Sequence, residues 1–314
     1  MQLEQELAGL QDYRDSAVTI GVFDGVHLGH KYLIYRLKEL ARQQDLRSVV
    51  VTFHEHPQEV LAPHRAAPPF LTDSTEKAAL LKKEGVDSVV ILTFTKKLAR
   101  MSAREFLNLL KSKLKMRSLV IGPDFSMGRD NEGDIPTLRR LEKEMGFKLT
   151  VVPPAVKNEE IVSSTAIRKA LEEGDMEKVG MLMGRPFSLH GKVIRGKGRG
   201  SNIGFPTANL KVLPGQALPA DGVYLTLVYA SGKAYHSLTN MGTNPTFGSA
   251  ERTIESHLFD FHSDLYRREI RIEFVHKLRN EIEFVNPEEL TRQINKDIQQ
   301  AKTLLVDEGI TEHE

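Results

Sequence analysis

The chain has 314 residues, and its 43 Lys and Arg against 42 Asp and Glu give a formal net charge of +1. This length favours two domains over one, and the balanced charge argues against a general nucleic-acid-binding protein, which would carry a basic excess. Because the sequence contains no cysteine, disulfides, thiolate metal sites and thiol nucleophiles are excluded.

The N-terminal segment and the hydropathy of the chain indicate the compartment in which the protein works. The N-terminal segment from Met1 to Asp15 is acidic and polar, unlike a signal peptide. No apolar run approaches the length of about 18 residues that a membrane span needs. We expect a cytoplasmic protein with small-molecule substrates and with neither a nucleic-acid nor a membrane partner, and the patterns leave its oligomeric state open.

In the first half of the chain, from Ala17 to about Met183, short apolar runs alternate with helical patterns. The predicted strands are residues 18–23, 47–53, 88–94, 118–122 and 147–152, and the predicted helices are 30–44, 74–84, 103–113 and 135–145. This α/β alternation is typical of a Rossmann-like, doubly wound parallel sheet. Ligands of such sheets bind beyond the carboxyl ends of the strands.

The most informative segment is the glycine-rich turn from Gly21 to His30, which joins the first predicted strand to a helical pattern. Such a strand, turn and helix bring backbone N–H groups and a helix N-terminus to a phosphate, and His27 and His30 add side-chain donors. The candidate ATP-binding residues of the turn are Gly21, Phe23, Asp24, Gly25 and Gly29. The arrangement suits attack on the α-phosphate of a nucleoside triphosphate. The alternative is a common glycine turn with two solvated histidines.

The spacing His27-Leu28-Gly29-His30 resembles the H-x-G-H nucleotidyltransferases, whose Rossmann-like members transfer AMP or CMP. Farther along, Ser163-Ser164-Thr165-Ala166-Ile167-Arg168 follows the last predicted strand of this half. Ser163 or Ser164 is a good N-cap for a helix over 166–172, and plain capping is the simpler interpretation. The resemblance implies that a segment at this position relative to His27 and His30 closes the triphosphate site, here through Ser164, Thr165 and Arg168.

Two further segments follow predicted strands and therefore reach the same edge of the sheet. One contains His56-Pro57, and the other runs from Gly122 to Gly128 through Asp124 and Phe125. A histidine after a strand is more often structural than catalytic. Together the segments resemble the F-x-x-H-P and G-x-D-F-x-x-G segments of flavin-specific adenylyltransferases, which implies flavin binding by His56, Asp124 and Phe125. Sequences of that kind carry another basic residue after the last glycine of the second segment, whereas in this chain Arg129 is followed by Asp130.

After Gly184-Arg185-Pro186 the pattern changes to strands without intervening helices, so we predict a domain boundary near Gly184, with domains 1–183 and 184–314. The predicted strands are residues 187–194, 222–229, 233–239, 253–259 and 269–276. Breaks at 215–222 and 231–233 fit antiparallel connections. The pattern predicts a small antiparallel β-barrel, followed by a terminal amphipathic helix that starts at Pro287.

The start of this second half almost matches a P-loop, from Gly191 through Gly196 and Lys197 to Gly198. Gly198 lacks the hydroxyl that holds Mg²⁺ in a P-loop, and we expect no helix after it, which argues against a Walker-type NTPase. The glycines up to Gly204 allow positive φ angles and a close approach to a ligand; a flexible surface hairpin is the alternative. In the following Pro206-Thr207-Ala208-Asn209, Thr207 and Asn209 share a strand face, where their oxygens suit Mg²⁺.

This G-x-x-x-x-G…G-F-P-T-A-N pattern resembles the riboflavin kinases, and the segments 240–247 and 251–260 extend the resemblance. It implies phosphate binding by Gly191, Gly196, Gly198, Gly204, Pro206, Thr207 and Asn209. Strand alternation places Glu255 on one face with Thr253 and His257, and we expect that face to point into the barrel, where a carboxylate needs a partner or a task. The resemblance implies that Glu255 is the general base of the kinase; the alternative is a surface salt bridge.

Taken together, the chain resembles the bacterial bifunctional riboflavin kinase/FMN adenylyltransferases. The resemblance implies a Mg²⁺-dependent enzyme that uses ATP to phosphorylate riboflavin to FMN in the C-terminal domain and to adenylylate FMN to FAD in the N-terminal domain. Two other functions remain open: a nucleotidyltransferase for a different phosphate acceptor, and a flavin-binding regulator without catalysis. An aminoacyl-tRNA synthetase is disfavoured. The segment Lys115-Met116-Arg117-Ser118 only faintly resembles the K-M-S-K-S loop of those enzymes, and it lies at the start of a predicted strand.

Overall fold

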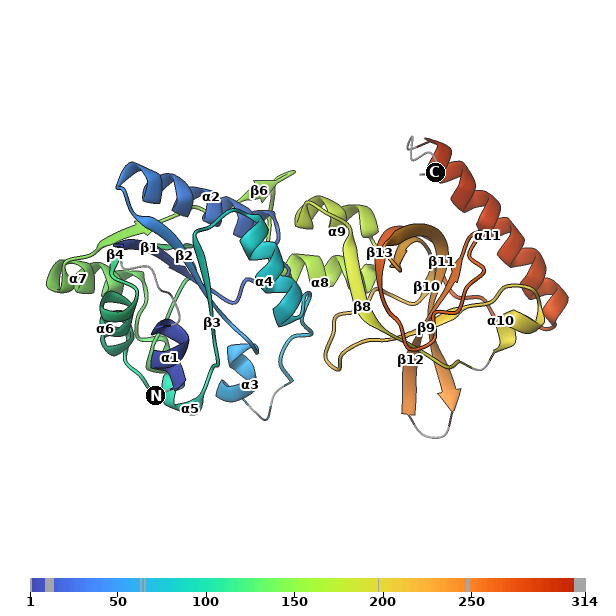
Figure 1. Cartoon of the computed structure of the whole chain (residues 1–314), viewed down its shortest axis with the longest axis horizontal. Helices are drawn as coiled ribbons and strands as arrows, with labels where there is room; N and C mark the ends of the chain where they lie inside the picture. Colours follow the sequence, from blue (N-terminus) through green and yellow to red (C-terminus); the bar gives the residue numbers. More distant parts are fainter. Residues whose placement is uncertain are drawn as a thin grey trace. The chain divides into compact units, whose positions relative to one another are not determined.

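The computed structural model describes residues 2–8, 14–62, 64, 66–196, 198–246 and 249–307. The chain divides into two compact units, Met1–Ala166 and Ile167–Glu314 (Figure 1). In the described part of the chain, none of the helices combines the length and the apolar character that crossing a bilayer requires. The boundary predicted at Gly184 stays a prediction, and the two helices that precede it, α8 and α9, are grouped with the second unit apart from the first residues of α8.

The first unit is built around the predicted parallel sheet, with the strand order β3-β2-β1-β4-β5 (Figure 1). Its strands are β1 (Ser16–Ile20), β2 (Arg47–Phe53), β3 (Ser88–Leu92), β4 (Met116–Ile121) and β5 (Lys148–Val151). Its helices are α1 (Gln2–Ala8), α2 (Leu28–Gln43), α3 (Pro57–Leu61), α4 (Ser74–Lys83), α5 (Lys96–Ala99), α6 (Ala103–Lys113) and α7 (Ile135–Met145), with a short 3-10 turn η1 (Arg129–Asn131) and a small hairpin, β6 (Val156–Lys157) and β7 (Glu160–Ile161). The predicted doubly wound fold is confirmed.

The first strand is shorter than predicted. Residues 21–23 leave the sheet, because Phe23 takes a positive φ of 53° and begins a turn. The chain moves from β1 to β2 and β3 on one side and then returns to β4 on the other side of β1. In doubly wound sheets, the place where the order reverses forms the ligand crevice at the carboxyl ends of the strands. The turn after β1 and the loop after β4 therefore border the expected site.

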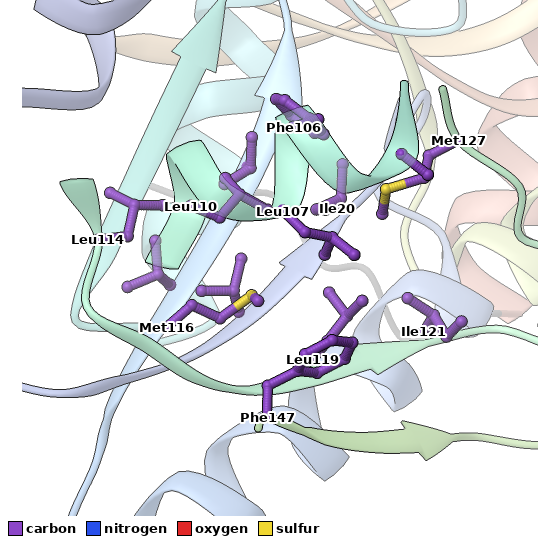
Figure 2. Packing of buried hydrophobic residues seen from close by; sticks show 14 of the residues in the cluster. Ile20, Phe106, Leu107, Leu110, Leu114, Met116, Leu119, Ile121, Met127 and Phe147 are labelled. Atoms are coloured by element: carbon purple, nitrogen blue, oxygen red, sulfur yellow. The ribbon is translucent and has the colours of Figure 1, made fainter. Parts of the chain in front are cut away.

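Period-2 alternation along the strands builds two hydrophobic layers, one on each face of the sheet. Val18 and Ile20 pack on one face with side chains of α1, α6 and α7, whereas Ala17 packs on the other face with side chains of α2 and α4. Figure 2 shows Leu107 and Leu110 of α6 above the strand side chains of the first layer. Burial of one such leucine contributes roughly 1.5–3 kcal/mol to stability, so this layer fixes the strands that end at the site.

Helix caps fix the ends of the covering helices. The carboxylate of Asp73 accepts hydrogen bonds from the backbone N–H groups of Thr75 and Glu76 and so begins α4. Ser102 and Glu105 form a capping box at the start of α6, and these hydrogen bonds lower the pKa of Glu105. These caps fix where α4 and α6 begin beside the carboxyl ends of the strands.

The second unit contains α8 (Ser164–Glu173, from Ile167 on), α9 (Met176–Met183) and a closed barrel with the order β10-β11-β12-β9-β8-β13. The remaining elements are β8 (Phe187–Ile194), α10 (Arg199–Asn202), β9 (Ala208–Lys211), β10 (Gly222–Ala230), β11 (Lys233–Thr246), β12 (Ser249–Leu258), β13 (Glu269–Arg279) and α11 (Pro287–Asp307). The predicted antiparallel barrel and its terminal helix are confirmed.

Both predicted connections join strands of the antiparallel barrel. Ser231 and Gly232 form the tight turn between β10 and β11, with Ala230 opposite Lys233. The segment 215–222 leads from β9 into β10, which run in opposite directions but are not neighbours, because β9 pairs with β8 and β12 whereas β10 pairs with β11 and β13. The strand β9, at four residues, is too short to show a pattern and was not predicted.

The interior of the barrel contains a row of buried hydroxyl groups. The Thr226 hydroxyl lies 2.7 Å from the hydroxyls of both Ser237 and Thr239, and the Thr239 hydroxyl lies 2.7 Å from that of Ser256. A buried hydroxyl costs stability unless it is hydrogen-bonded, and here the hydroxyls bond one another. Ser256, and with it Ile254 and Leu258 on the same side of β12, therefore faces inward.

Helix α11 is anchored to the outside of the barrel by an ion pair. Asp297, only 2% exposed, accepts hydrogen bonds from Arg279 of β13 through both carboxylate oxygens (3.0 and 2.8 Å) and one from Gln293 (2.8 Å). Nearby, Ala301 and Leu305 pack on the apolar outer face of β10 and β11. The ion pair thus fixes the register of the helix on this apolar face.

Replacing Asp297 with Ala should destabilise the second unit by about 3 kcal/mol, because it leaves the Arg279 guanidinium half-buried without its counter-charge. Thermal denaturation followed by circular dichroism measures the effect, with the exposed Glu288→Ala on the same helix as control. An unchanged transition would show that the apolar face alone holds α11.

Candidate active sites

The predicted phosphate turn leaves β1 with its backbone still tied to β2. The N–H of Gly21 donates to the carbonyl of Val51 (3.1 Å). Three residues of the turn then take positive φ angles: Phe23 (53°), Gly25 (81°) and Val26 (37°). Such angles are uncommon outside glycine and mark functional turns. Backbone strain is therefore concentrated between the strand and α2.

The two predicted histidines meet at the start of α2. His27 is its N-cap, and its Nδ1 accepts a hydrogen bond from the N–H of His30 (3.4 Å). The two rings stack with centroids 3.7 Å apart, and the Phe23 ring lies 5.1 Å from that of His30. Both imidazoles are therefore held beside the N-terminus of α2, where anions bind.

The environment of His30 favours its neutral form. Burial lowers its pKa well below 6.5, and the charges of His27 and Lys77 lower it further. Its buried Nδ1 finds no hydrogen-bond partner among the residues that the structure describes. His30 is therefore neutral at pH 7. Its Nδ1 can form one further hydrogen bond, and leaving a buried polar atom without one costs free energy.

Asp24, predicted to bind ATP, turns its carboxylate into the protein. Its Oδ1 accepts hydrogen bonds from the N–H groups of Leu71 (2.8 Å) and Thr72 (3.2 Å), and the Thr72 hydroxyl accepts one from Gly25 (3.1 Å). These contacts fasten the turn to the segment before α4. The structure thus shows a positioning task for Asp24, and its contact with ATP stays a prediction.

The serine-rich segment does reach the turn within the first unit. The Ser163 hydroxyl accepts from the N–H of Ala166 (3.1 Å) and caps α8, as predicted, whereas the Ser164 hydroxyl donates to the carbonyl of Asp24 (2.9 Å). Thr165 is exposed on the first turn of α8. Arg168 lies one helical turn after Ser164 and belongs to the second unit, so its role at the turn stays a prediction.

Gly29 has no room for a side chain. A Cβ there would lie 2.8 Å from the carbonyl oxygen of Val162 and 3.0 Å from the ring of His27. Gly29→Ala should therefore lower the free energy of unfolding by about 1–3 kcal/mol, because backbone and ring must both move. Thermal denaturation measures this, with Gly122→Ala as control, since a Cβ at Gly122 meets nothing within 4 Å. Equal stability of the two variants would contradict this packing.

The predicted flavin-binding residues lie after β2 and β4. His56 caps α3: its Nδ1 accepts from the N–H of Gln58 (3.2 Å) and its own N–H donates to Glu59 (3.4 Å). Asp124 is exposed, and Phe125 packs at the margin of the larger hydrophobic layer. Arg129 in the same loop pairs with Glu132 (3.9 Å). Flavin binding by His56, Asp124 and Phe125 stays a prediction.

A further residue near the turn, Lys77, was not predicted. It lies on the first turn of α4, is 4% exposed, and donates a hydrogen bond from Nζ to the carbonyl of Phe53 (2.6 Å) at the end of β2. Burial lowers its pKa, against the opposing effect of nearby carboxylates. The one available signal was its position four residues before Leu81, on the apolar side of α4.

In the second unit, the glycine loop follows β8. Gly198 and Gly204 take positive φ angles of 71° and 88°, as predicted. The expectation that no helix follows Gly198 is wrong, because the one-turn helix α10 begins at Arg199. At only four residues it is no P-loop helix. Lys197, Phe247 and Gly248 lie outside the described residues.

The predicted Thr207, Asn209 and Glu255 come together. The Thr207 hydroxyl donates to Glu255 Oε2 (3.3 Å), and Asn209 of β9 lies opposite Glu255 of β12 in the ladder. A Cβ at Gly196 would lie 2.3 Å from the Asn209 amide nitrogen, so the glycine loop passes directly over Asn209. Gly191 instead lies within β8, where a Cβ would collide with the carbonyl of Lys211.

The expected orientation of Glu255 is wrong. Ile254, Ser256 and Leu258 are the buried residues of β12, whereas Glu255 and His257 are only half-buried. Alternation therefore holds, but the face that carries Glu255 is the outer face of the barrel. There its carboxylate meets Thr207 and retains solvent contact, so its charge does not carry the desolvation cost of a barrel interior.

A pocket of about 360 Å³ opens beside these residues. Its walls include Gly196, Pro206 and Thr207 from the predicted set, together with Arg195 and Tyr266. The Arg195 guanidinium lies 5.0 Å from the centre of the Tyr266 ring, a cation–π contact that holds both side chains at the rim. Asn209, Glu255, Gly191, Gly198 and Gly204 do not line this pocket.

The donor set around Thr207 fits magnesium. A hydroxyl, a carboxamide and a carboxylate supply oxygen ligands, and Mg²⁺ takes one or two protein ligands together with substrate phosphates. Within the described ranges, no group of three or more His, Asp and Glu side chains is arranged to hold a metal ion. Magnesium binding by Thr207 and Asn209 stays a prediction.

Comparison with known families divides the chain in two. A family model described as FAD synthetase matches residues 10–166, and one described as riboflavin kinase matches residues 183–305. The first match contains the His27–His30 turn, and the second contains Thr207, Asn209 and Glu255. The two matches thus separate the histidine turn from the contact between Thr207 and Glu255, and Arg168 lies between the two matched ranges.

Two bacterial relatives align over almost the whole chain. A bifunctional riboflavin kinase/FMN adenylyltransferase of Haemophilus influenzae is 37% identical over 91% of this chain and 93% of its own. The Escherichia coli K12 protein of the same name is 38% identical over 89% of this chain and 90% of its own. A crystal structure described as a macrolide-efflux protein from Streptococcus pneumoniae is 30% identical, with a TM-score of 0.86 over 96% of this chain and 97% of that one.

Proposed function

This chain belongs to the family of bifunctional riboflavin kinase/FMN adenylyltransferases, and from this premise we propose which of its residues carry out the two reactions. The enzyme converts riboflavin and ATP into FMN, and then FMN and ATP into FAD. We assign the first reaction to the domain 184–314 and the second to the domain 1–183.

In the first reaction, Glu255 acts as the general base. Its carboxylate removes the proton of the riboflavin 5′-hydroxyl while that oxygen attacks the γ-phosphorus of ATP. The bond from the γ-phosphorus to ADP breaks, which gives FMN and ADP. Thr207 and Asn209 would hold Mg²⁺, which supplies charge neutralisation on the phosphates when bound. The contact between Thr207 and Glu255 (3.3 Å) supports a shared site for base and phosphate groups.

In the second reaction, a phosphate oxygen of FMN attacks the α-phosphorus of ATP. The bond between this phosphorus and the oxygen of pyrophosphate breaks, so that FAD and pyrophosphate leave. No covalent enzyme intermediate is needed. His27, His30 and the N-terminus of α2 stabilise the negative charge that grows on the phosphate oxygens. Ser164, Thr165 and Arg168 hold the triphosphate, and His56, Asp124 and Phe125 hold the flavin.

A single observation supports this assignment most strongly: the residues assigned to the chemistry of the two reactions lie in two separate compact units. The stacked His27 and His30 lie in the first unit, and the Thr207–Glu255 contact lies in the second. One site therefore need not share any catalytic residue with the other.

The assay is a time course with riboflavin, ATP and Mg²⁺, in which the three flavins are separated by chromatography. FMN should appear first and FAD later, because the product of the first reaction is the acceptor of the second. FAD that forms without FMN as a precursor would overturn the proposed sequence.

A further inference from the structure

The ammonium group of Lys77 is buried near the 21–30 turn, at a position where hydrophobic packing does not require a charged side chain. Lys77 is 4% exposed, and its Nζ reaches the carbonyl of Phe53 at the carboxyl end of β2. Burial of an ammonium group is costly. A position on the first turn of α4 adds a second cost, because the N-terminus of a helix repels positive charge. An apolar side chain would avoid both costs.

The segment that carries Lys77 is fastened to the turn. Leu71 and Thr72 donate to the Asp24 carboxylate, and the Thr72 hydroxyl accepts from Gly25. On the other side, the Thr52 hydroxyl of β2 donates to the carbonyl of Val22 (3.0 Å). The turn is thus held between β2 and the start of α4, and Lys77 joins these two elements.

The charges around Lys77 come from each of these elements. Asp24 on the turn, Glu55 after β2 and Asp73 before α4 stabilise its positive charge, whereas His30 and His27 lie on the side of α2. Of these three carboxylate side chains, that of Asp24 is buried. An ammonium and a buried carboxylate offset part of each other's desolvation cost.

We propose that Lys77 is a positioning residue for adenylyl transfer: through its bond to Phe53 and its charge opposite Asp24, it holds the 21–30 turn and His30 where the nucleotide phosphates bind. One of its three N–H donors is used on Phe53, and its charge acts on the turn through Asp24. This inference rests on the proposed role of His30 in the second reaction.

The charge of Lys77 also affects the protonation of His30. It is the third cause that lowers the His30 pKa, after burial and the charge of His27. Loss of this charge should raise the pKa of His30, although burial still keeps it below 6.5. A lysine that only filled space between α4 and β2 would leave the titration of His30 unchanged when replaced.

The test compares the neutral variants Lys77→Met and Lys77→Gln with Lys77→Arg, which keeps the charge, and with the exposed Lys83→Met of the same helix as control. The neutral variants should lose on the order of 10- to 100-fold in kcat/KM for conversion of FMN to FAD, as expected for a displaced catalytic group. Riboflavin kinase activity should stay at the parent level. NMR titration of the His30 ring, assigned by its absence from His30→Ala, should show a higher pKa only in the neutral variants.

An unchanged His30 titration, or unchanged FAD formation, in a folded neutral variant would overturn the proposal. So would failure of both neutral variants to fold while Lys77→Arg folds, because Lys77 would then serve folding alone. The proposed function fails separately: if His30→Ala still forms FAD at the parent rate, His30 has no role. If His30→Ala loses FAD formation but Lys77→Met does not, only the inference about Lys77 fails.

Discussion

Replacing Glu255 with Gln is expected to abolish formation of FMN from riboflavin while FMN supplied to the same protein is still converted to FAD. Glutamine keeps the shape of the side chain and can still meet the Thr207 hydroxyl, which lies 3.3 Å from Glu255 Oε2. It cannot accept the proton of the riboflavin hydroxyl. A positioned general base contributes about 10²- to 10⁴-fold to a rate, and this is the expected loss in kcat of the first reaction.

The matched control for this variant is Glu269→Gln, an exposed glutamate on β13 of the same barrel. Both reactions should continue at the parent rate in the control. FMN formation by Glu255→Gln at more than about a tenth of the parent rate would remove Glu255 as the base, since a general base contributes more than this. Loss of both reactions would instead indicate unfolding of the whole chain.

Replacing His30 with Ala is expected to cause FMN to accumulate from riboflavin. His30 is neutral at pH 7, since burial, His27 and Lys77 all lower its pKa, and its buried Nδ1 can form a further hydrogen bond. Removal of one preorganised donor to a developing oxyanion costs about 10²- to 10³-fold in kcat. The second reaction should slow by this factor while the first continues.

Chromatography of the flavins during the reaction measures this effect, and His64→Ala, an exposed histidine of the same unit, is the control. FAD production by His30→Ala at the parent rate would remove His30 from the mechanism. The pH dependence of the second reaction gives a further test. Because the pKa of His30 is lowered, its protonation in the free enzyme should reduce kcat/KM for conversion of FMN to FAD only below pH 6.5.

Local pattern was sufficient to predict the elements that carry the sites. The sheet follows from alternating apolar runs and helical spacing, and the strand, glycine turn and helix around His27 and His30 lie together in sequence. Such features depend on residues near one another in the chain, where helix and strand periods apply.

Features that depend on distant residues were not predictable. Alternation showed which residues share a face with Glu255 but not that this face is the outer one, because the inside of a barrel is defined by strand closure. The sequence of α4 does not reveal that Lys77 is buried with its Nζ on the carbonyl of Phe53, because Phe53 lies 24 residues earlier, at the end of β2. The strand β9 pairs with β12 through only two residues and is itself four residues long, too short to show a period.

In the proposed enzyme, the two reactions take place at two independent sites on one chain. The most direct test mixes the Glu255→Gln and His30→Ala proteins with riboflavin, ATP and Mg²⁺. Neither variant alone should make FAD at an appreciable rate, and the mixture should make it, because FMN released by the intact kinase site of His30→Ala becomes the substrate of the intact turn in Glu255→Gln. A mixture that forms FMN but no FAD, although Glu255→Gln converts supplied FMN, would contradict the account.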